Sequence, residues 1–144
     1  MRLAILLLFG IISCTSASWR RKQRVIAKGR LMCGHLPAAN VLVKLMDEDD
    51  GLDSDDLMAE GRTDQNGGFL LNGTESEITN IDPVIEVFTD CNRSKKLKNC
   101  DRKWKVKIPD KYIMNEGEKT QKVFDLGAVN LHAILKGESR DCLH

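Results

Sequence analysis

The sequence lacks a second long hydrophobic run, a large net charge and an abundance of aromatic side chains. Residues 3–12 are apolar apart from Gly10, but ten residues are too few to span a bilayer. No run of membrane length follows, so the mature protein should be soluble. Lysine and arginine number 22 against 21 acids, so the overall charge selects no class of partner. Aromatic residues make up only 5% of the chain, which argues against base stacking and therefore against nucleic acid as a partner.

Motifs that carry catalysis are also missing. The chain contains no G-x-S-x-G, no H-E-x-x-H and no glycine loop that would hold a phosphate. The histidines are few and far apart, at His35, His132 and His144. We therefore expect no catalytic site, no cofactor and no metal, and a protein that is not an enzyme.

The amino terminus predicts export from the cell. Arg2 gives a positive start, the apolar run follows, and small residues lead to a cleavage site after Ala17. Ile11 to Cys14 also fits the acylated-cysteine box of a bacterial lipoprotein, which is the alternative interpretation. We expect a signal peptide at residues 1–17, a basic and solvated tail at residues 18–24, and one secreted, extracellular domain at residues 25–144.

Four cysteines remain after cleavage, and an even number in a secreted chain indicates disulfides. Four cysteines allow three pairings, and no C-x2-C pair supports zinc instead. Cys91 and Cys100 are close in sequence and are expected to close a loop. Cys33 would then bond to Cys142, joining the first strand to the end of the chain.

Alternating apolar residues predict an all-β fold. Val41, Val43 and Leu45 recur at every second position, as do Trp104 and Val106 further along. Asp64 to Gly68 is a strong turn signal because Asn-Gly accepts positive φ. Pro83 is acceptable as the first residue of a strand. Seven or eight short strands without an amphipathic helix predict a β-sandwich of two sheets.

Two sequons suit a secreted protein. Asn72 is followed by Gly73-Thr74, and Asn92 by Arg93-Ser94. Both asparagines fall in predicted turns, so both are candidate glycosylation sites.

Several segments together resemble the secreted transthyretin-like proteins of nematodes. The resemblance covers about residues 25–142 and depends on the order of the segments as much as on any one of them. The segments are Gly29–Gly34, Pro37–Leu45, Asp55–Leu57, Gly61–Phe69, Ile81–Pro83, Asp90–Cys91, Ile108–Ile113 and Asp125–Gly127.

The resemblance implies a transthyretin-like (prealbumin-like) sandwich of two four-stranded sheets, but not the function of transthyretin itself. Hydroxyisourate hydrolases of this fold use histidines, an arginine and a carboxy-terminal Tyr-Arg-Gly-Ser. This chain instead ends with Arg140-Asp141-Cys142-Leu143-His144, so the hydrolase motif is absent. Family members have been linked to bridging, in which phosphatidylserine on dying or damaged cells is joined to a receptor on the engulfing cell.

Two charged segments are candidates for that role. The first, which we call the basic set, is expected to bind an anionic phospholipid surface by peripheral contact, and it contains Arg93, Lys95, Lys96, Lys98, Arg102, Lys103, Lys105 and Lys107. Alternatively its lysines only protect an edge strand. The second, the acidic set, is expected to face the receptor, and it contains Asp47, Glu48, Asp49, Asp50, Asp53, Asp55 and Asp56.

Placing the two sets on different parts of the sandwich would suit a two-sided adaptor. A solvated loop and a Ca²⁺ site are other interpretations of the acidic set, although its spacing does not match an EF-hand. A carrier of a small apolar ligand is the alternative function, and a hydrolase is the third.

Overall fold

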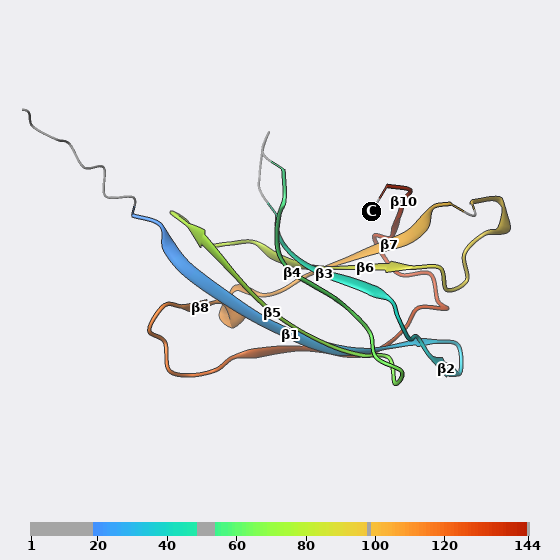
Figure 1. Cartoon of the computed structure of the whole chain (residues 1–144), viewed down its shortest axis with the longest axis horizontal. Coiled ribbons are helices and arrows are strands. Elements are labelled where there is room, and N and C mark those ends of the chain that lie inside the picture. The colour runs from blue at the N-terminus through green and yellow to red at the C-terminus, as the bar shows by residue number, and fades with distance from the viewer. Residues whose placement is uncertain (1–18, 49–53, 98, 144) are drawn as a thin grey trace, which may run out of the picture.

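The computed structural model describes residues 19–48, 54–97 and 99–143. Within these ranges, ten strands form two sheets of five strands that pack face to face (Figure 1). Sheet A contains β1 (Arg21–Cys33), β2 (Leu36–Pro37), β5 (Gly68–Glu77), β8 (Met114–Asn115) and β9 (Val123–Asn130). Sheet B contains β3 (Leu42–Asp47), β4 (Asp56–Arg62), β6 (Pro83–Thr89), β7 (Asp101–Lys107) and β10 (Ser139–Asp141). The predicted β-sandwich is confirmed, with short additional strands that raise each sheet from four strands to five.

Two short 3-10 helices complete the described elements. They are η1 (Lys95–Leu97) and η2 (Asp110–Tyr112). In the described part of the chain, no helix is long and apolar enough to cross a membrane.

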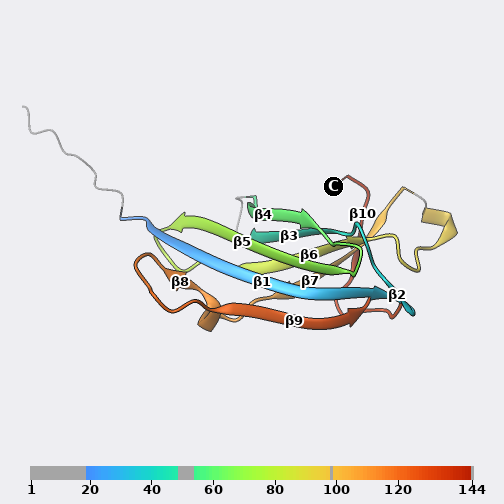
Figure 2. The same ribbon diagram turned by 60° about the horizontal axis from the view of Figure 1, so that its bottom comes forward.

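Strand β1 is the centre of sheet A. It pairs antiparallel with β5 on one side and parallel with β9 on the other (Figure 2). The strand begins at Arg21, so residues 21–24 are not part of a solvated tail as expected. They are ordered because they pair with β5, from Arg21 opposite Glu77 to Arg24 opposite Thr74.

Sheet B is built around β6, in the order β10-β7-β6-β3-β4. Every residue of β6 is buried because strands cover both of its edges and side chains cover both of its faces. Pro83 begins this strand, as predicted, and its carbonyl accepts a hydrogen bond from the amide of Ile108.

The core lies between the sheets and follows the predicted alternation. Val43 and Leu45 of β3 are fully buried and pack with Val25 and Ala27 of β1. Trp104, Val106 and Ile108 also contact this core, as expected. In β3 and β7, alternate positions therefore carry the apolar contacts, and the other positions point outward.

The turn between β4 and β5 carries the chain from one sheet to the other. The Asp64 carboxylate accepts hydrogen bonds from the amides of Asn66 and Gly68, both at 2.8 Å. Gly67 has a φ of 78°, and a side chain there would collide with the Leu31 carbonyl oxygen at 2.1 Å. The predicted turn is confirmed, and glycine is required at this position.

Strand β5 continues where a turn was expected. Asn72 and Gly73 lie within the strand, so the first sequon is not in a turn. A Cβ on Gly73 would lie 2.7 Å from the Cβ of Met58, so this glycine serves close packing against β4 instead of positive φ. Near the end of the chain, β9 runs through Gly127, which has a φ of 76°, and its pairing with β1 shifts register between Lys28 and Arg30.

The predicted disulfide pairing is wrong. The bonds are Cys33–Cys91 and Cys100–Cys142, instead of Cys91–Cys100 and Cys33–Cys142. The chain turns sharply after β6, where Asn92 has a φ of 53° and the amide of Arg93 donates to the carbonyl of Asp90. This turn places Cys91 in the core beside the end of β1, while Cys100 precedes β7 and lies beside the strand that leads to Cys142.

Candidate functional site

The lysines of β7 form a row on the outer face of sheet B, but each one already has a carboxylate partner. The ammonium of Lys103 lies 2.9 Å from Glu86, and that of Lys107 lies 2.6 Å from Asp82. Lys105 lies 2.8 Å from Glu48 and 3.2 Å from Glu86. An anionic surface would have to compete with these carboxylates for the same charges.

The acidic set lies beside this lysine row, not on a different part of the sandwich. Glu48 and Asp55 both pair with Lys105, the latter at 3.6 Å. Asp47 is buried and its carboxylate accepts a hydrogen bond from the amide of Asp82. Asp56 is exposed in β4, and the remaining members, Asp49, Asp50 and Asp53, lie outside the described residues. The expected separation of a basic face from an acidic face is therefore wrong.

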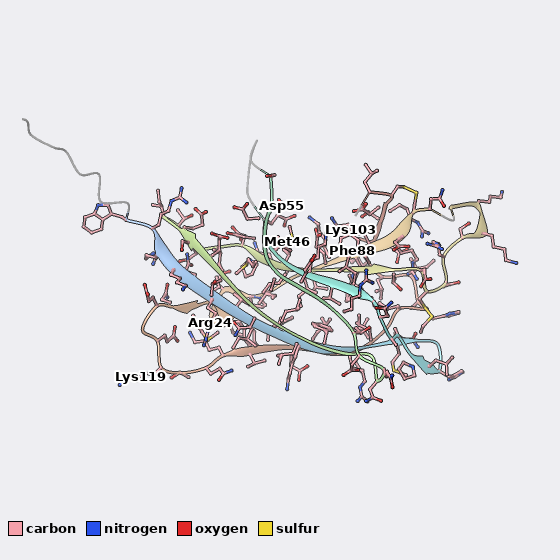
Figure 3. The ribbon with its side chains drawn as sticks, viewed as in Figure 1. Arg24, Met46, Asp55, Phe88, Lys103 and Lys119 are labelled. Carbon is pink, nitrogen blue, oxygen red and sulfur yellow. A yellow bond between two sulfur atoms is a disulfide. The ribbon has the colours of Figure 1, made fainter. Side chains whose placement is uncertain are left out.

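A buried carboxylate organises this cluster. Glu86 is only 3% exposed, and one of its oxygens lies within 2.9 Å and 3.2 Å of the Lys103 and Lys105 ammonium groups. Phe88 lies on the same face beneath Lys103, with the ammonium 5.2 Å from the ring centre (Figure 3). Burial lowers the pKa of Lys105, but the carboxylates of Glu48 and Glu86 more than offset this and hold the pKa above its ordinary value. The charges of the β7 lysines are thus neutralised by neighbouring carboxylates on the outer face of sheet B.

The other members of the basic set are dispersed. Arg93 pairs with Asp101 at 2.7 Å, and Lys95 and Lys96 are exposed on η1. Lys98 lies outside the described residues. Arg102 is 3% exposed and therefore belongs to the interior, so the structure does not bring the set together as one surface.

Arg102 joins β7 to the segment that follows β9. Its guanidinium donates to the carbonyls of Cys91 at 2.8 Å and Ala133 at 2.7 Å, and also to the carbonyl of Leu131. It pairs with the carboxylate of Glu138, and this hydrogen bond lowers the pKa of Glu138 despite burial of that group. Arg102 is thus a structural residue.

The outer face of sheet A carries a second group of cations, which sequence reasoning missed. Alternate positions of β1 point away from the core and form what we call the cationic stripe: Lys22, Arg24, Lys28 and Arg30. The β5 residues opposite them are uncharged, from Ser76 through Thr74 to Leu70. Lys28 pairs with Asp125 at 3.4 Å, whereas Lys22 and Arg30 form no ion pair within the described residues.

The sequence did contain a signal for this stripe. Lysine or arginine occurs at positions 22, 24, 28 and 30, which share the two-residue period of a strand. The signal was missed because residues 18–24 were interpreted as a tail, so the period was never followed across Val25.

Two hollows lie along this face. One, of about 330 Å³, is formed where β1 meets β5 and the turn after β8, and Lys22 and Arg24 line it. The other, of similar volume, lies further along β1 and is lined by Lys28, Arg30 and Asp125. Both are open to solvent, and both are bordered by cations of the stripe.

His35 and His132 are exposed, and His144 lies outside the described residues. His132 lies within 4.8 Å of the sulfurs of Cys33 and Cys91, but those two sulfurs are bonded to each other. In the described ranges, no histidine is therefore combined with a free thiol or a cluster of carboxylates.

Comparison with known proteins gives consistent matches. The model of the Transthyretin-like family matches residues 28–109. Transthyretin-like protein 5 of Caenorhabditis elegans is 44% identical over 144 residues, which is the full length of both chains. Transthyretin-like protein 46 of the same organism is 45% identical over 143 residues, covering 99% of this chain and 78% of the relative. Transthyretin-like protein 33 is 45% identical over 122 residues, covering 85% of this chain and 83% of the relative.

Proposed function

Since the chain belongs to the transthyretin-like family, we propose that it is an extracellular binding protein that attaches to anionic phospholipid surfaces. The contact is the outer face of sheet A, and the observation that carries the proposal is the cationic stripe on β1. Lys22, Arg24 and Arg30 point outward there and form no ion pair with a carboxylate of the described residues, whereas the lysines of β7 are already paired.

The geometry of the stripe suits a flat, charged surface. Side chains at alternate positions of a strand are about 7 Å apart, so several cations can meet different head groups at once. Each lysine or arginine near an anionic leaflet contributes roughly 1 kcal/mol, and less at higher salt. Leu70, which is 68% exposed, lies on β5 directly opposite Lys28 and adds an apolar contact to the same face.

The role we propose for this contact is that of an adaptor. Sheet A would bind phosphatidylserine-type lipid on dying or damaged cells, and a receptor on an engulfing cell would bind elsewhere on the sandwich. The outer face of sheet B supports this assignment because it points away from the lipid-binding face and mixes acidic and basic groups.

Vesicle binding tests the proposal. Residues 18–144, with disulfides intact, would be sedimented with phosphatidylserine or phosphatidylcholine vesicles at ~150 mM salt. The stripe variant would carry glutamine at Lys22, Arg24, Lys28 and Arg30. The matched control would carry glutamine at four exposed lysines elsewhere, namely Lys95, Lys96, Lys111 and Lys136.

We expect the parent and the control to bind phosphatidylserine selectively and the stripe variant to lose binding. Equal loss in both variants would show that only total charge matters. Retention by the stripe variant would reject the assigned face, and no sedimentation of the parent with either vesicle would reject lipid binding altogether.

A further inference from the structure

One of the two hollows on the outer face of sheet A has the features of a site for a single chemical group. It lies near the amino-terminal end of β1, bounded by Thr74 of β5, Met114 and Asn115 of β8, and the turn at Gly117. Its volume of about 330 Å³ lies at the lower end of the range for small-molecule sites. Figure 3 shows Arg24 beside β8, where β1 and this turn meet.

Arg24 is the central side chain of this hollow. In the sheet it lies between Thr74 of β5 and Met114 of β8. It is half-buried, and its one hydrogen-bond partner within the described residues is the sulfur of Met114, at 3.9 Å. A guanidinium has five N–H donors and thioether sulfur is a weak acceptor, so most of its donors remain available to a ligand.

The neighbouring groups favour an anion with one charge. Lys22 adds a second cation, which has no ion pair with any residue that the structure describes, and Thr74 offers a hydroxyl. Two carboxylates also border the hollow. Glu118 is held by the Lys122 ammonium at 2.6 Å and by the amide of Asn115, whereas Glu116 is exposed and has no ion pair in the described part of the chain. Two cations against one uncommitted carboxylate leave a net charge near +1.

We propose that this hollow binds a phosphodiester group, with Arg24 and Lys22 as the recognising cations and Thr74 as an additional donor. A phosphodiester carries one negative charge, which matches the net charge of the hollow better than a dianion does. The planar guanidinium of arginine presents a fork of N–H donors that matches the spacing of phosphate oxygens. A half-buried guanidinium binds these oxygens more strongly than an exposed one. This inference rests on the proposed function, in which the phosphodiester belongs to a lipid head group. A free phosphodiester has the same chemistry.

The first test uses a soluble phosphodiester, so that the hollow is separated from the membrane. Glycerophosphoserine would be titrated into residues 18–144, which contain every described strand, while backbone amide shifts are followed by NMR. We expect saturable shifts at Thr74, Asn115 and Gly117, and none at Gly127, which lies in the other hollow. Sulfate, a dianion, should bind several-fold more weakly, and equal binding of sulfate would overturn the phosphodiester assignment.

Two arginine variants then separate the hollow from general charge. Arg24→Gln should weaken glycerophosphoserine binding about tenfold or more, as expected for loss of hydrogen bonds between charged groups. Arg140→Gln is the matched control because it removes the same charge from an exposed arginine of β10 in sheet B, outside both the stripe and the hollow, and it should change affinity by less than about twofold. Equal weakening by both variants, or shifts spread along the whole of β1, would overturn the proposal. Unchanged amide spectra away from the mutation would show that each variant is folded.

The outcomes distinguish this inference from the proposed function. Vesicle binding without any response to glycerophosphoserine would support the cationic stripe as the lipid-binding surface but reject the hollow as a phosphodiester site. A response to glycerophosphoserine without vesicle binding would support the hollow as a site for a free phosphodiester but reject the proposal that the protein binds lipid surfaces.

Discussion

At the scale of single residues, two arginines of the described strands differ in how far the fold satisfies their N–H donors. Arg102 and Arg24 are both half or more withdrawn from solvent, but Arg102 satisfies its donors with carbonyls and Glu138, whereas the guanidinium of Arg24 has one hydrogen-bond partner among the described residues, the sulfur of Met114. A buried guanidinium with a full set of acceptors stabilises the fold, since removing it leaves those acceptors unsatisfied.

We therefore expect Arg102→Met to lower the free energy of unfolding by about 3–5 kcal/mol, because three carbonyls and one carboxylate lose their donor. Arg93→Gln is the control, since the Arg93–Asp101 pair is partly exposed and should contribute no more than about 1 kcal/mol. Denaturant unfolding with disulfides intact measures both. A loss for Arg102→Met as small as that of the control would contradict the structural role.

The sequence contained enough information to place Arg102 correctly. It shares the two-residue period of Trp104 and Val106, whose alternation was predicted and which pack against the core. Counting it with Lys103, Lys105 and Lys107 mixed the two faces of one strand. The partners of those lysines were less predictable, because Glu48 and Glu86 come from strands whose neighbours only the sheet order determines.

At the scale of elements, the disulfides connect different parts of the sandwich. Cys33–Cys91 links the end of β1 in sheet A to the end of β6 in sheet B, whereas Cys100–Cys142 joins two neighbouring strands of sheet B. The bonds span 58 and 42 residues, for which the chain-entropy model gives about 4 kcal/mol each.

Replacing both cysteines of a pair by serine should therefore have unequal effects. The Cys100→Ser, Cys142→Ser protein should lose about 4 kcal/mol, and the Cys33→Ser, Cys91→Ser protein more, because Cys91 is also part of the core. Denaturant unfolding gives the order of the two variants. Peptide mapping of the parent without reduction checks the pairing independently, and a peptide linking Cys91 to Cys100 would contradict it.

Strands with a clear alternation were predictable, and those stabilised by their neighbours were not. Val43 and Leu45 identified β3, and Asp64 to Gly68 identified the turn into β5. The continuation of β5 through Gly73 follows from packing against Met58, and the pairing of the cysteines follows from the turn at Asn92. Such long-range contacts override local turn signals and closeness in sequence.

At the scale of the whole molecule, a net charge of +1 conceals two unlike faces. The outer face of sheet B pairs its lysines with carboxylates, whereas the outer face of sheet A carries the cationic stripe. Asn72 lies on the second of these faces, directly opposite Ile26 and between the cross-strand partners of Arg24 and Lys28. A glycan there would project from the middle of the stripe.

Glycosylation of Asn72 and flat contact with a membrane are therefore mutually exclusive. We expect protein from eukaryotic cells that carries a glycan at Asn72, identified by mass spectrometry, to bind phosphatidylserine vesicles several-fold more weakly than the Asn72→Gln protein. Asn92→Gln is the control, because Asn92 lies in the turn after β6 and a glycan there should leave binding unchanged. Equal binding with and without the Asn72 glycan would place the membrane contact on another face, because a glycan cannot fit between the stripe and a lipid surface that touches it.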